Sequence, residues 1–113
     1  MATIINSENA PAPIGPYNQS VRTGNLLFVS GQVPLIAETM ELVTDSIESE
    51  THQVMKNIKA ILNEAGLDFK NIVKASIFCK DLNDFNRINE VYGSYFSDKD
   101  PARECVEVSR LPK

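Results

Sequence analysis

The side chain best suited to ligand chemistry in this sequence is Arg103, which directly follows Pro101 and Ala102. Proline stiffens the loop before a strand, so the guanidinium can point into a concave mouth, where its planar fork suits a small carboxylate. From spacing alone, the alternative is a surface ion pair with a neighbouring acid such as Glu104 or Glu107. The residues leave both interpretations of Arg103 open.

Few other residues could do chemistry. His52 is the only histidine, and its place off the apolar stripe of a helix favours a solvated residue over a general base. Cys105 could be a nucleophile, but a small side chain on a strand more often belongs to the core or to a pocket wall. A Ser/His/Asp or Cys/His hydrolase therefore lacks a convincing base.

The sequence contains no pattern that predicts a metal or a nucleotide. Cys79 and Cys105 lie far apart without CxxC spacing or a His/Cys cluster, which indicates neither a zinc site nor a disulfide scaffold. Neither GxGxxG nor GxxxxGK[ST] occurs, so nucleotide-dependent chemistry has no support. We expect no metal and no cofactor.

Length and charge set wider limits. The chain has 113 residues, 42% of them apolar, and a net charge of −4, which fits a single domain over 1–113 and gives no basic run for nucleic acid or anionic lipid. No apolar stretch approaches the ~20 residues of a membrane span, and the N-terminus lacks the features of a secretory signal. We therefore expect a cytoplasmic protein that contacts no membrane.

The elements that must position these residues follow the periods of strands and helices. Three of the six prolines lie within 9–17, which predicts an extended arm because proline fixes φ and lacks a donor. The predicted elements after this arm are a hairpin of 18–22 and 26–30, a helix over 45–65 stopped by Gly66, a strand over 71–80, a helix capped by Asn83 with an apolar stripe from Phe85 to Phe96, and a strand over 104–109. Two helices on one face of a mixed sheet predict an α+β fold, whose other sheet face needs a partner.

Four stretches of the sequence carry a resemblance to a known family. They are NAPAPIGPY at 9–17, VSGQVP at 29–34, KDLNDF at 80–85 and PARECVEV at 101–108. Together, in order and over nearly the whole chain, they resemble the reactive intermediate deaminase (Rid) family, also called YjgF-like. The resemblance implies a chorismate-mutase-like homotrimer, in which three sheets form a central β-barrel, the helices lie outside and the active sites lie between subunits.

The resemblance also implies an activity, the hydrolysis of reactive enamines and imines. The substrates would be 2-aminoacrylate, 2-iminopropanoate and 2-iminobutanoate, released by pyridoxal-phosphate-dependent dehydratases, and the products would be 2-oxo acids and ammonia. Because the electrophile is already activated, the protein need only orient the carboxylate, place one water and shuttle protons.

Matching motifs carry the family's site residues onto this chain. The resemblance implies that Arg103 grips the substrate carboxylate, with Ser30 and the backbone of Gly31 on the pocket floor. Arg103, Ser30 and Tyr17 would then be catalytic residues. The structural alternative for Ser30 is a hydrogen bond to its sheet neighbours alone, and for Tyr17 it is packing of the ring.

Asn89 and Cys105 would complete the implied pocket. Asn89 lies in the second predicted helix, and the main chain of Cys105 lies two residues after Arg103. The structural alternative for Asn89 is a solvated position on the helix surface. These two residues, with Arg103 and Gly31, form the implied substrate-binding set.

Two features depart from the family pattern. In the family a further strand follows the Leu-Pro-Lys turn and carries a glutamate that holds the attacking water, whereas this sequence ends at Lys113. We therefore expect the chain to lack its last strand and to be an incomplete form of a longer one. Glu104 replaces a more usual small or apolar residue beside Arg103, and strand alternation predicts that it faces away.

Two other functions compete with the deaminase. One is a non-catalytic regulatory module that binds small carboxylates through the same Arg103 cleft. The other, less favoured, is the endoribonuclease or translation-inhibitor activity attributed to some relatives, because a net charge of −4 without a basic aromatic strip is atypical of RNA binding.

Overall fold

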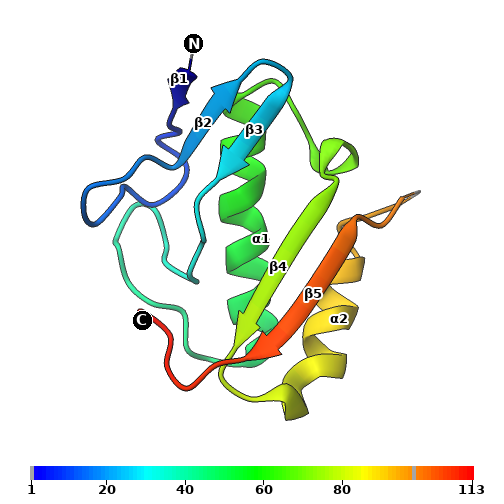
Figure 1. Cartoon of the computed structure of the whole chain (residues 1–113). Helices are drawn as coiled ribbons and strands as arrows, with labels where there is room; N and C mark the ends of the chain where they lie inside the picture. The colour runs from blue at the N-terminus through cyan, green and yellow to red at the C-terminus, as the bar shows by residue number, and fades with distance from the viewer. Residues whose placement is uncertain (1, 98) are drawn as a thin grey trace.

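The computed structural model describes residues 2–97 and 99–113 as two small sheets backed by two helices (Figure 1). The strands are β1 (Ala2–Ile5), β2 (Ser20–Thr23), β3 (Leu26–Val29), β4 (Lys74–Cys79) and β5 (Ala102–Glu107). The helices are α1 (Ile47–Glu64) and α2 (Phe85–Gly93), with short 3-10 turns η1 (Phe69–Asn71) and η2 (Leu82–Asp84). Strands β1-β2-β3 are antiparallel in that order, and β4 and β5 are a parallel pair. The expected α+β class, with two helices on one face, is confirmed.

Helix α1 begins and ends where the sequence predicts, because both ends carry capping residues. The Ser46 side chain accepts a hydrogen bond from the backbone N of Ser49, and Glu48 and Glu50 lie in the first turn, where acidic side chains complement the helix dipole. At the other end, Gly66 has a φ of +76°, which only glycine adopts without strain. Neither helix of the described ranges is long and apolar enough to cross a membrane.

The second helix begins differently from the prediction. Asn83 is not its N-cap: the carboxylate of Asp81 accepts a hydrogen bond from the backbone N of Asn83 and so caps η2. Helix α2 starts directly after this turn, and Asp84 at its N-cap makes no side-chain capping bond. Aspartate and asparagine are equally good capping residues. The sequence therefore did not show whether Asp81 or Asn83 is the cap.

The strands also differ at their ends from the prediction. Strand β1 was missed because its four residues are too short to show a period, yet it pairs with β2, with Ile4 opposite Val21. Strand β4 starts later than expected because η1 occupies 69–71, and Val73 lies outside the strand, 76% exposed.

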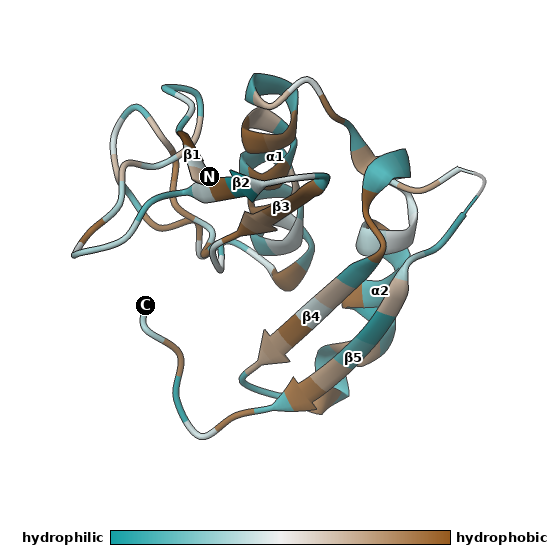
Figure 2. Cartoon of the chain, turned by 45° about the horizontal axis from the view of Figure 1, so that its top comes forward, coloured by the Kyte–Doolittle hydropathy of each residue, from teal (hydrophilic) through white to brown (hydrophobic). Residues whose placement is uncertain are grey.

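The core lies between the helices and the strand face turned toward them. Its buried members are Met55, Leu62 and Phe69. Around them pack the partly buried Leu27, Ile58, Leu67, Ile72, Tyr92, Tyr95 and Phe96. Leu27 of β3 points into this cluster, so its neighbour Phe28 points to the opposite face. Figure 2 shows α1 behind β2 and β3 and α2 behind β5.

Strands β3 and β4 are not paired with each other, and a gap separates them (Figure 1). In the described ranges, β3 pairs with β2 and β4 pairs with β5, so the expected mixed sheet is divided into two parts. Beyond β5 the chain turns back past the end of β4, where Val108 N donates to the Cys79 carbonyl at 2.9 Å and Lys80 Nζ donates to the Ser109 carbonyl at 2.7 Å.

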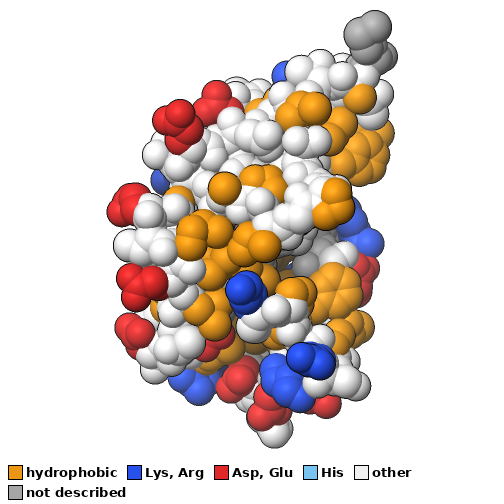
Figure 3. Space-filling view, turned by 90° about the vertical axis from the view of Figure 1, so that its left-hand side faces the viewer, with side chains coloured by type: hydrophobic (Ala, Val, Ile, Leu, Met, Phe, Trp, Pro, Cys, Tyr) orange, Lys and Arg blue, Asp and Glu red, His pale blue; other side chains and the backbone are white. Residues whose placement is uncertain are grey.

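The strand face turned away from the helices exposes large apolar side chains. Phe28 on β3 is 61% exposed, Phe78 on β4 58% and Val106 on β5 40%. Hydrophobic side chains also occupy the middle and right-hand side of Figure 3, whereas acidic ones line its left-hand edge. Charged side chains also lie within this surface, because Lys74 and Glu104 project from the same face of β4 and β5.

Candidate functional site

Arg103 lies on the face of β5 that is turned toward the helices. Along β5, Arg103 and Cys105 are half-buried, whereas Ala102, Glu104 and Val106 are exposed. Nη1 of Arg103 donates a hydrogen bond of 2.6 Å to Oδ1 of Asn89 on α2. The structure thus brings together three of the six predicted site residues, two of them by a direct hydrogen bond.

Two aromatic rings of α2 flank the same guanidinium. Cζ of Arg103 is 5.6 Å from the ring centroid of Phe85 and 5.1 Å from that of Tyr92. Phe85, Asn89 and Tyr92 are four and three residues apart, so they lie on one face of the helix. Rings attract a cation through their negative faces. One face of α2 therefore holds Arg103 with an amide and two aromatic rings.

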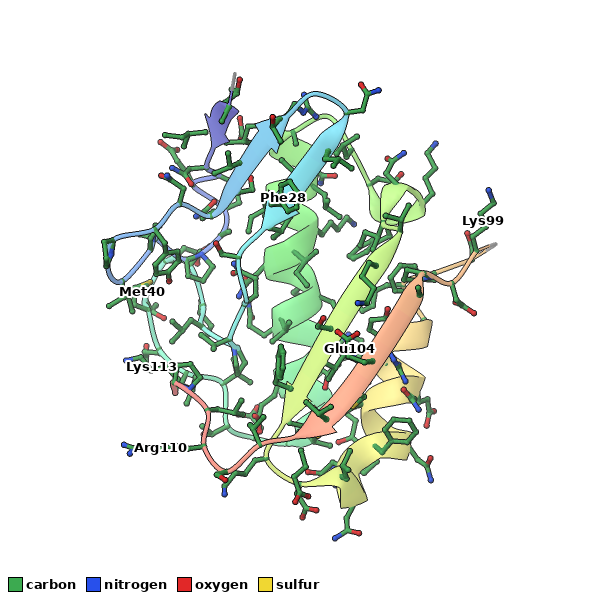
Figure 4. The ribbon with its side chains drawn as sticks, in the orientation of Figure 1. Phe28, Met40, Lys99, Glu104, Arg110 and Lys113 are labelled. Carbon is green, nitrogen blue, oxygen red and sulfur yellow. The ribbon has the colours of Figure 1, made fainter. Side chains whose placement is uncertain are left out.

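Glu104 lies on the opposite face of β5, as strand alternation predicts (Figure 4). Its carboxylate pairs with Lys74 Nζ at 2.8 Å and accepts a hydrogen bond from the Ser76 hydroxyl. The hydrogen bonds from Lys74 and Ser76 lower the pKa of Glu104 below its ordinary value. This acid is therefore occupied elsewhere and does not neutralise Arg103.

Within the described ranges, no carboxylate forms an ion pair with Arg103. By contrast, Arg87, which lies on the opposite face of α2 because it is two residues from Phe85 and from Asn89, binds Glu48 and Asp84. A guanidinium has five N–H donors, and Arg103 gives Asn89 one of its Nη1 hydrogens. The surface ion pair considered from the sequence is absent among these residues, and Arg103 keeps donors for an anion.

Ser30 and Gly31 lie at the other sheet. The Ser30 hydroxyl donates to the Asn18 carbonyl at 2.7 Å, and Ser30 N donates to the Gln19 carbonyl at 2.9 Å. Gly31 follows as an exposed residue. Both residues come directly after β3, which is separated from β5 by β4 (Figure 1). A single chain therefore does not bring Ser30 and Gly31 to Arg103.

Tyr17 lies with this second group, at the end of the proline-rich arm. Its side chain is 48% exposed, and its hydroxyl accepts a hydrogen bond of 3.4 Å from Ile14 N. The ring also lies 3.8 Å from the position of a Cβ on Gly15, whose φ is +130°. Tyr17 is therefore held by its own arm and does not reach Arg103 within one chain.

Two buried side-chain amides, neither of them predicted from the sequence, bind the backbone of the segments before β2 and after β3. Gln19, 2% exposed, accepts from Ser7 N and donates to the carbonyls of Ser7, Ala10 and Pro11. Asn57, 1% exposed, donates to the carbonyls of Val33 and Leu35. Asn57 could have been found, because it interrupts the apolar stripe of α1. Gln19 had no such signal.

The two cysteines lie on neighbouring strands. Cys105 on β5 is opposite Ile77 on β4, two residues before Cys79. Burial, followed by the neighbouring Cys105, raises the pKa of the Cys79 thiol, which makes the reactive thiolate less available. The Cys79 thiol is therefore suited to a wall rather than to nucleophilic attack. His52 is exposed, and its Nδ1 lies 2.8 Å from the Tyr95 hydroxyl.

Two surface hollows of the chain lie apart from these groups. One of about 460 Å³ is on the outer side of α1 and one of about 260 Å³ is beside the β2–β3 turn, and neither lining includes a predicted site residue. Among residues 2–97 and 99–113, no group of three or more His, Cys, Asp or Glu side chains is placed to hold a metal ion.

Comparison with known proteins decides the family. The model of the family described as "Endoribonuclease L-PSP" matches residues 7–113. A RutC family protein of Pyrococcus horikoshii is 50% identical over 113 residues, which are 100% of this chain and 90% of the relative. The chloroplastic Reactive Intermediate Deaminase A of Arabidopsis thaliana is 43% identical over 109 residues, 96% of this chain and 58% of the relative. The chain belongs to the reactive intermediate deaminase (Rid) family.

A solved structure of another Rid protein adds a ligand. The crystal structure of E. coli TdcF with bound serine superimposes with a TM-score of 0.93 at 43% sequence identity, over 98% of this chain and 89% of that one. The expected YjgF-like fold is thus confirmed. The bound serine is a property of TdcF.

Proposed function

We propose that this Rid protein is an enamine and imine deaminase that hydrolyses 2-aminoacrylate and related 2-imino acids to 2-oxo acids and ammonia. The observation that carries the proposal is the half-buried guanidinium of Arg103, held by Asn89 and two rings and without a carboxylate partner in the described ranges. The Arabidopsis relative that is named a reactive intermediate deaminase supports the same activity.

In this mechanism Arg103 binds the substrate carboxylate through paired N–H donors. The enamine tautomerises to an imine, water attacks the imine carbon, and the tetrahedral amino alcohol expels ammonia. Asn89 accepts a hydrogen bond from the guanidinium. The main chain of Cys105 lies two residues after Arg103 on β5. Orientation of an already activated electrophile supplies much of the acceleration.

We further propose that the site is completed by a second copy of the chain, in a homotrimer with a central β-barrel. Ser30, Gly31 and Tyr17 lie on the sheet that does not carry Arg103, so two chains would bring one group of each kind together. The exposed Phe28, Phe78 and Val106 support this arrangement, because contiguous apolar surface commonly marks an interface.

Replacement of Arg103 tests this function. Arg103→Ala removes charge-assisted hydrogen bonds whose net worth is about 1.5–3 kcal/mol, so we expect kcat/KM to fall about 10- to 150-fold. The measurement is 2-oxo acid formation from serine or threonine by an added dehydratase, with the oligomeric state checked by light scattering. Arg110→Ala is the matched control, since Arg110 is exposed beyond β5 (Figure 4). An unchanged rate in Arg103→Ala would remove the assignment.

The second candidate is a non-catalytic module that binds small carboxylates and regulates a partner. The serine bound in the TdcF structure favours it, because that structure shows a family member holding an amino acid. Calorimetry with 2-oxobutyrate separates the two functions: binding that depends on Arg103 without any acceleration of 2-oxo acid formation would establish the module. Ribonuclease activity is disfavoured because a net charge of −4 repels the phosphate backbone of RNA.

A further inference from the structure

The face of α2 that contacts Arg103 carries more than the asparagine. Phe85 and Tyr92 place their ring centroids 5.6 and 5.1 Å from Cζ of Arg103. The Tyr92 ring is itself held by Phe96, with centroids 4.9 Å apart, within the core cluster around Phe69. The rings that contact the guanidinium therefore belong partly to the rigid core.

We propose that Phe85 and Tyr92 form an aromatic clamp that positions the guanidinium of Arg103 for binding a carboxylate. This inference rests on the proposed function, because it explains how the carboxylate-binding residue is held. Phe85 and Tyr92 are positioning residues that act through Arg103, and the ligand that they serve is a small carboxylic acid.

The clamp lowers the entropy that the Arg103 side chain loses when a ligand binds. A free arginine side chain loses rotamer entropy when it is fixed. Two rings and the hydrogen bond to Asn89 fix Arg103 before any ligand arrives, so this cost is not subtracted from the affinity for the ligand. Loss of a ring should therefore weaken carboxylate binding although no contact with the carboxylate is lost.

The clamp also leaves the positive charge of Arg103 for the ligand. The Tyr92 hydroxyl is a buried polar atom without a hydrogen-bond partner in the described ranges. Burial raises the pKa of Tyr92, although the charge of Arg103 opposes this rise. The side chain thus stays neutral, whereas a phenolate or a carboxylate at this position would pair with the guanidinium and compete with an anionic ligand.

Leucine substitutions test the clamp in the full chain. We expect Tyr92→Leu and Phe85→Leu each to raise the dissociation constant for 2-oxobutyrate, measured by calorimetry, about 3- to 30-fold, and to raise KM more than they lower kcat. Tyr92→Phe keeps the ring and should restore affinity to within about twofold of the wild type. The matched control is Tyr95→Leu, because Tyr95 is half-buried in the same core cluster but contacts Phe69 and His52.

A second measurement does not depend on the proposed function. Nitrogen NMR of the Arg103 guanidinium should show an ordered side chain, with proton shifts from the ring currents of Phe85 and Tyr92, in the wild type and in Tyr95→Leu. The same signals should lose the ring-current shift of Phe85 in Phe85→Leu. This variant therefore tests the clamp even if Tyr92→Leu does not fold.

The outcomes separate this inference from the proposed function. If Phe85→Leu binds 2-oxobutyrate as tightly as Tyr95→Leu does and its guanidinium signals are those of the wild type, the clamp is wrong. If the signals change as expected but even the wild type binds no carboxylate, the clamp stands and the proposed function fails. A guanidinium that is disordered in the wild type would also overturn the clamp.

Discussion

Two arginines at helix α2 have different kinds of partner. Arg87 belongs to the helix, and Arg103 contacts it from β5. Arg87 is saturated by acids: its Nε and Nη2 donate to the two oxygens of Glu48 at 2.7 and 2.6 Å, and its Nη1 lies 3.6 Å from Asp84. Arg103 instead contacts an amide and two rings. Residue type alone therefore did not distinguish an arginine held in ion pairs from one without a carboxylate partner in the described ranges, whereas the contacts in the structure do.

The Arg87–Glu48 pair gives a pH-dependent contribution to stability. The hydrogen bond from Arg87 lowers the pKa of Glu48 to about 2 from 4.5. A lowered pKa in the folded state adds stability above the unfolded value, and that stability is lost as pH falls from about 4.5 to about 2. We expect Arg87→Met to be less stable than wild type at pH 6 and to approach it at pH 2. Urea unfolding across this range measures the difference.

Arg110→Met is the control for this prediction, because Arg110 is an exposed arginine outside both helices. Its stability difference from the wild type should change little between pH 6 and pH 2. A constant difference for Arg87→Met over the same range would contradict the assignment of the low pKa to this pair.

At the scale of elements, the proline-rich arm is held by one side chain rather than by regular structure. Gln19 makes four hydrogen bonds to the backbone of the arm, to groups of Ser7, Ala10 and Pro11. The backbone N of Gln19 also donates to Oδ1 of Asn6 at 2.8 Å. The position of Tyr17 at the end of the arm therefore depends on a residue directly before β2.

Removal of this amide should loosen the arm before it unfolds the chain. Gln19→Leu leaves buried backbone groups without partners, so we expect a loss of about 1–3 kcal/mol in the free energy of unfolding and faster proteolysis within 7–17. Thermal unfolding and mass spectrometry of the fragments measure the two effects. Gln53→Leu, a partly buried amide on α1, is the control, and equal proteolysis of both variants would show that Gln19 does not hold the arm.

The elements that the sequence predicted well are those with a long apolar stripe. Helix α1 was predicted within two residues at each end because Ser46 and Gly66 cap a regular pattern. Strand β1 and turns η1 and η2 were missed because three or four residues show no period. The N-cap was wrongly placed at Asn83 because turn η2, which contains Asn83, was missed.

The candidate site was predictable in part. Position after Pro101 singled out Arg103, and the family motifs added Asn89, to which Arg103 is now seen to donate. Phe85 and Tyr92 were read only as members of an apolar stripe, because a periodic pattern does not reveal that one ring faces a cation. The separation of Ser30 from Arg103 depends on strand order, which local patterns do not contain.

For the whole molecule, the exposed apolar face is the feature that most needs explanation. Phe28, Phe78 and Val106 project from three strands on the side away from the helices, and Lys74, Ser76 and Glu104 lie among them as a hydrogen-bonded polar group. In the proposed homotrimer this face would be covered by other copies of the chain.

Charged substitutions test this assembly. Phe28→Asp and Phe78→Asp change side chains that are exposed in the single chain, so the fold should persist. Burying an unpaired carboxylate in an interface is costly, so we expect sedimentation as a monomer and loss of deaminase activity. Leu82→Asp, an exposed residue of η2 outside the sheets, should leave the oligomer intact. Assembly of Phe78→Asp equal to that of Leu82→Asp would rule out the proposed interface.

The division of the sheet between β3 and β4 has a consequence for how this chain meets other polypeptides. In the described ranges β3 and β4 each have one edge without a partner strand, and α1 lies behind the gap between them (Figure 1). Such edges offer rows of amide and carbonyl groups that any extended backbone can bind, whatever its side chains. The division therefore leaves room in the sheet for one more strand, which main-chain hydrogen bonds to these edges would hold.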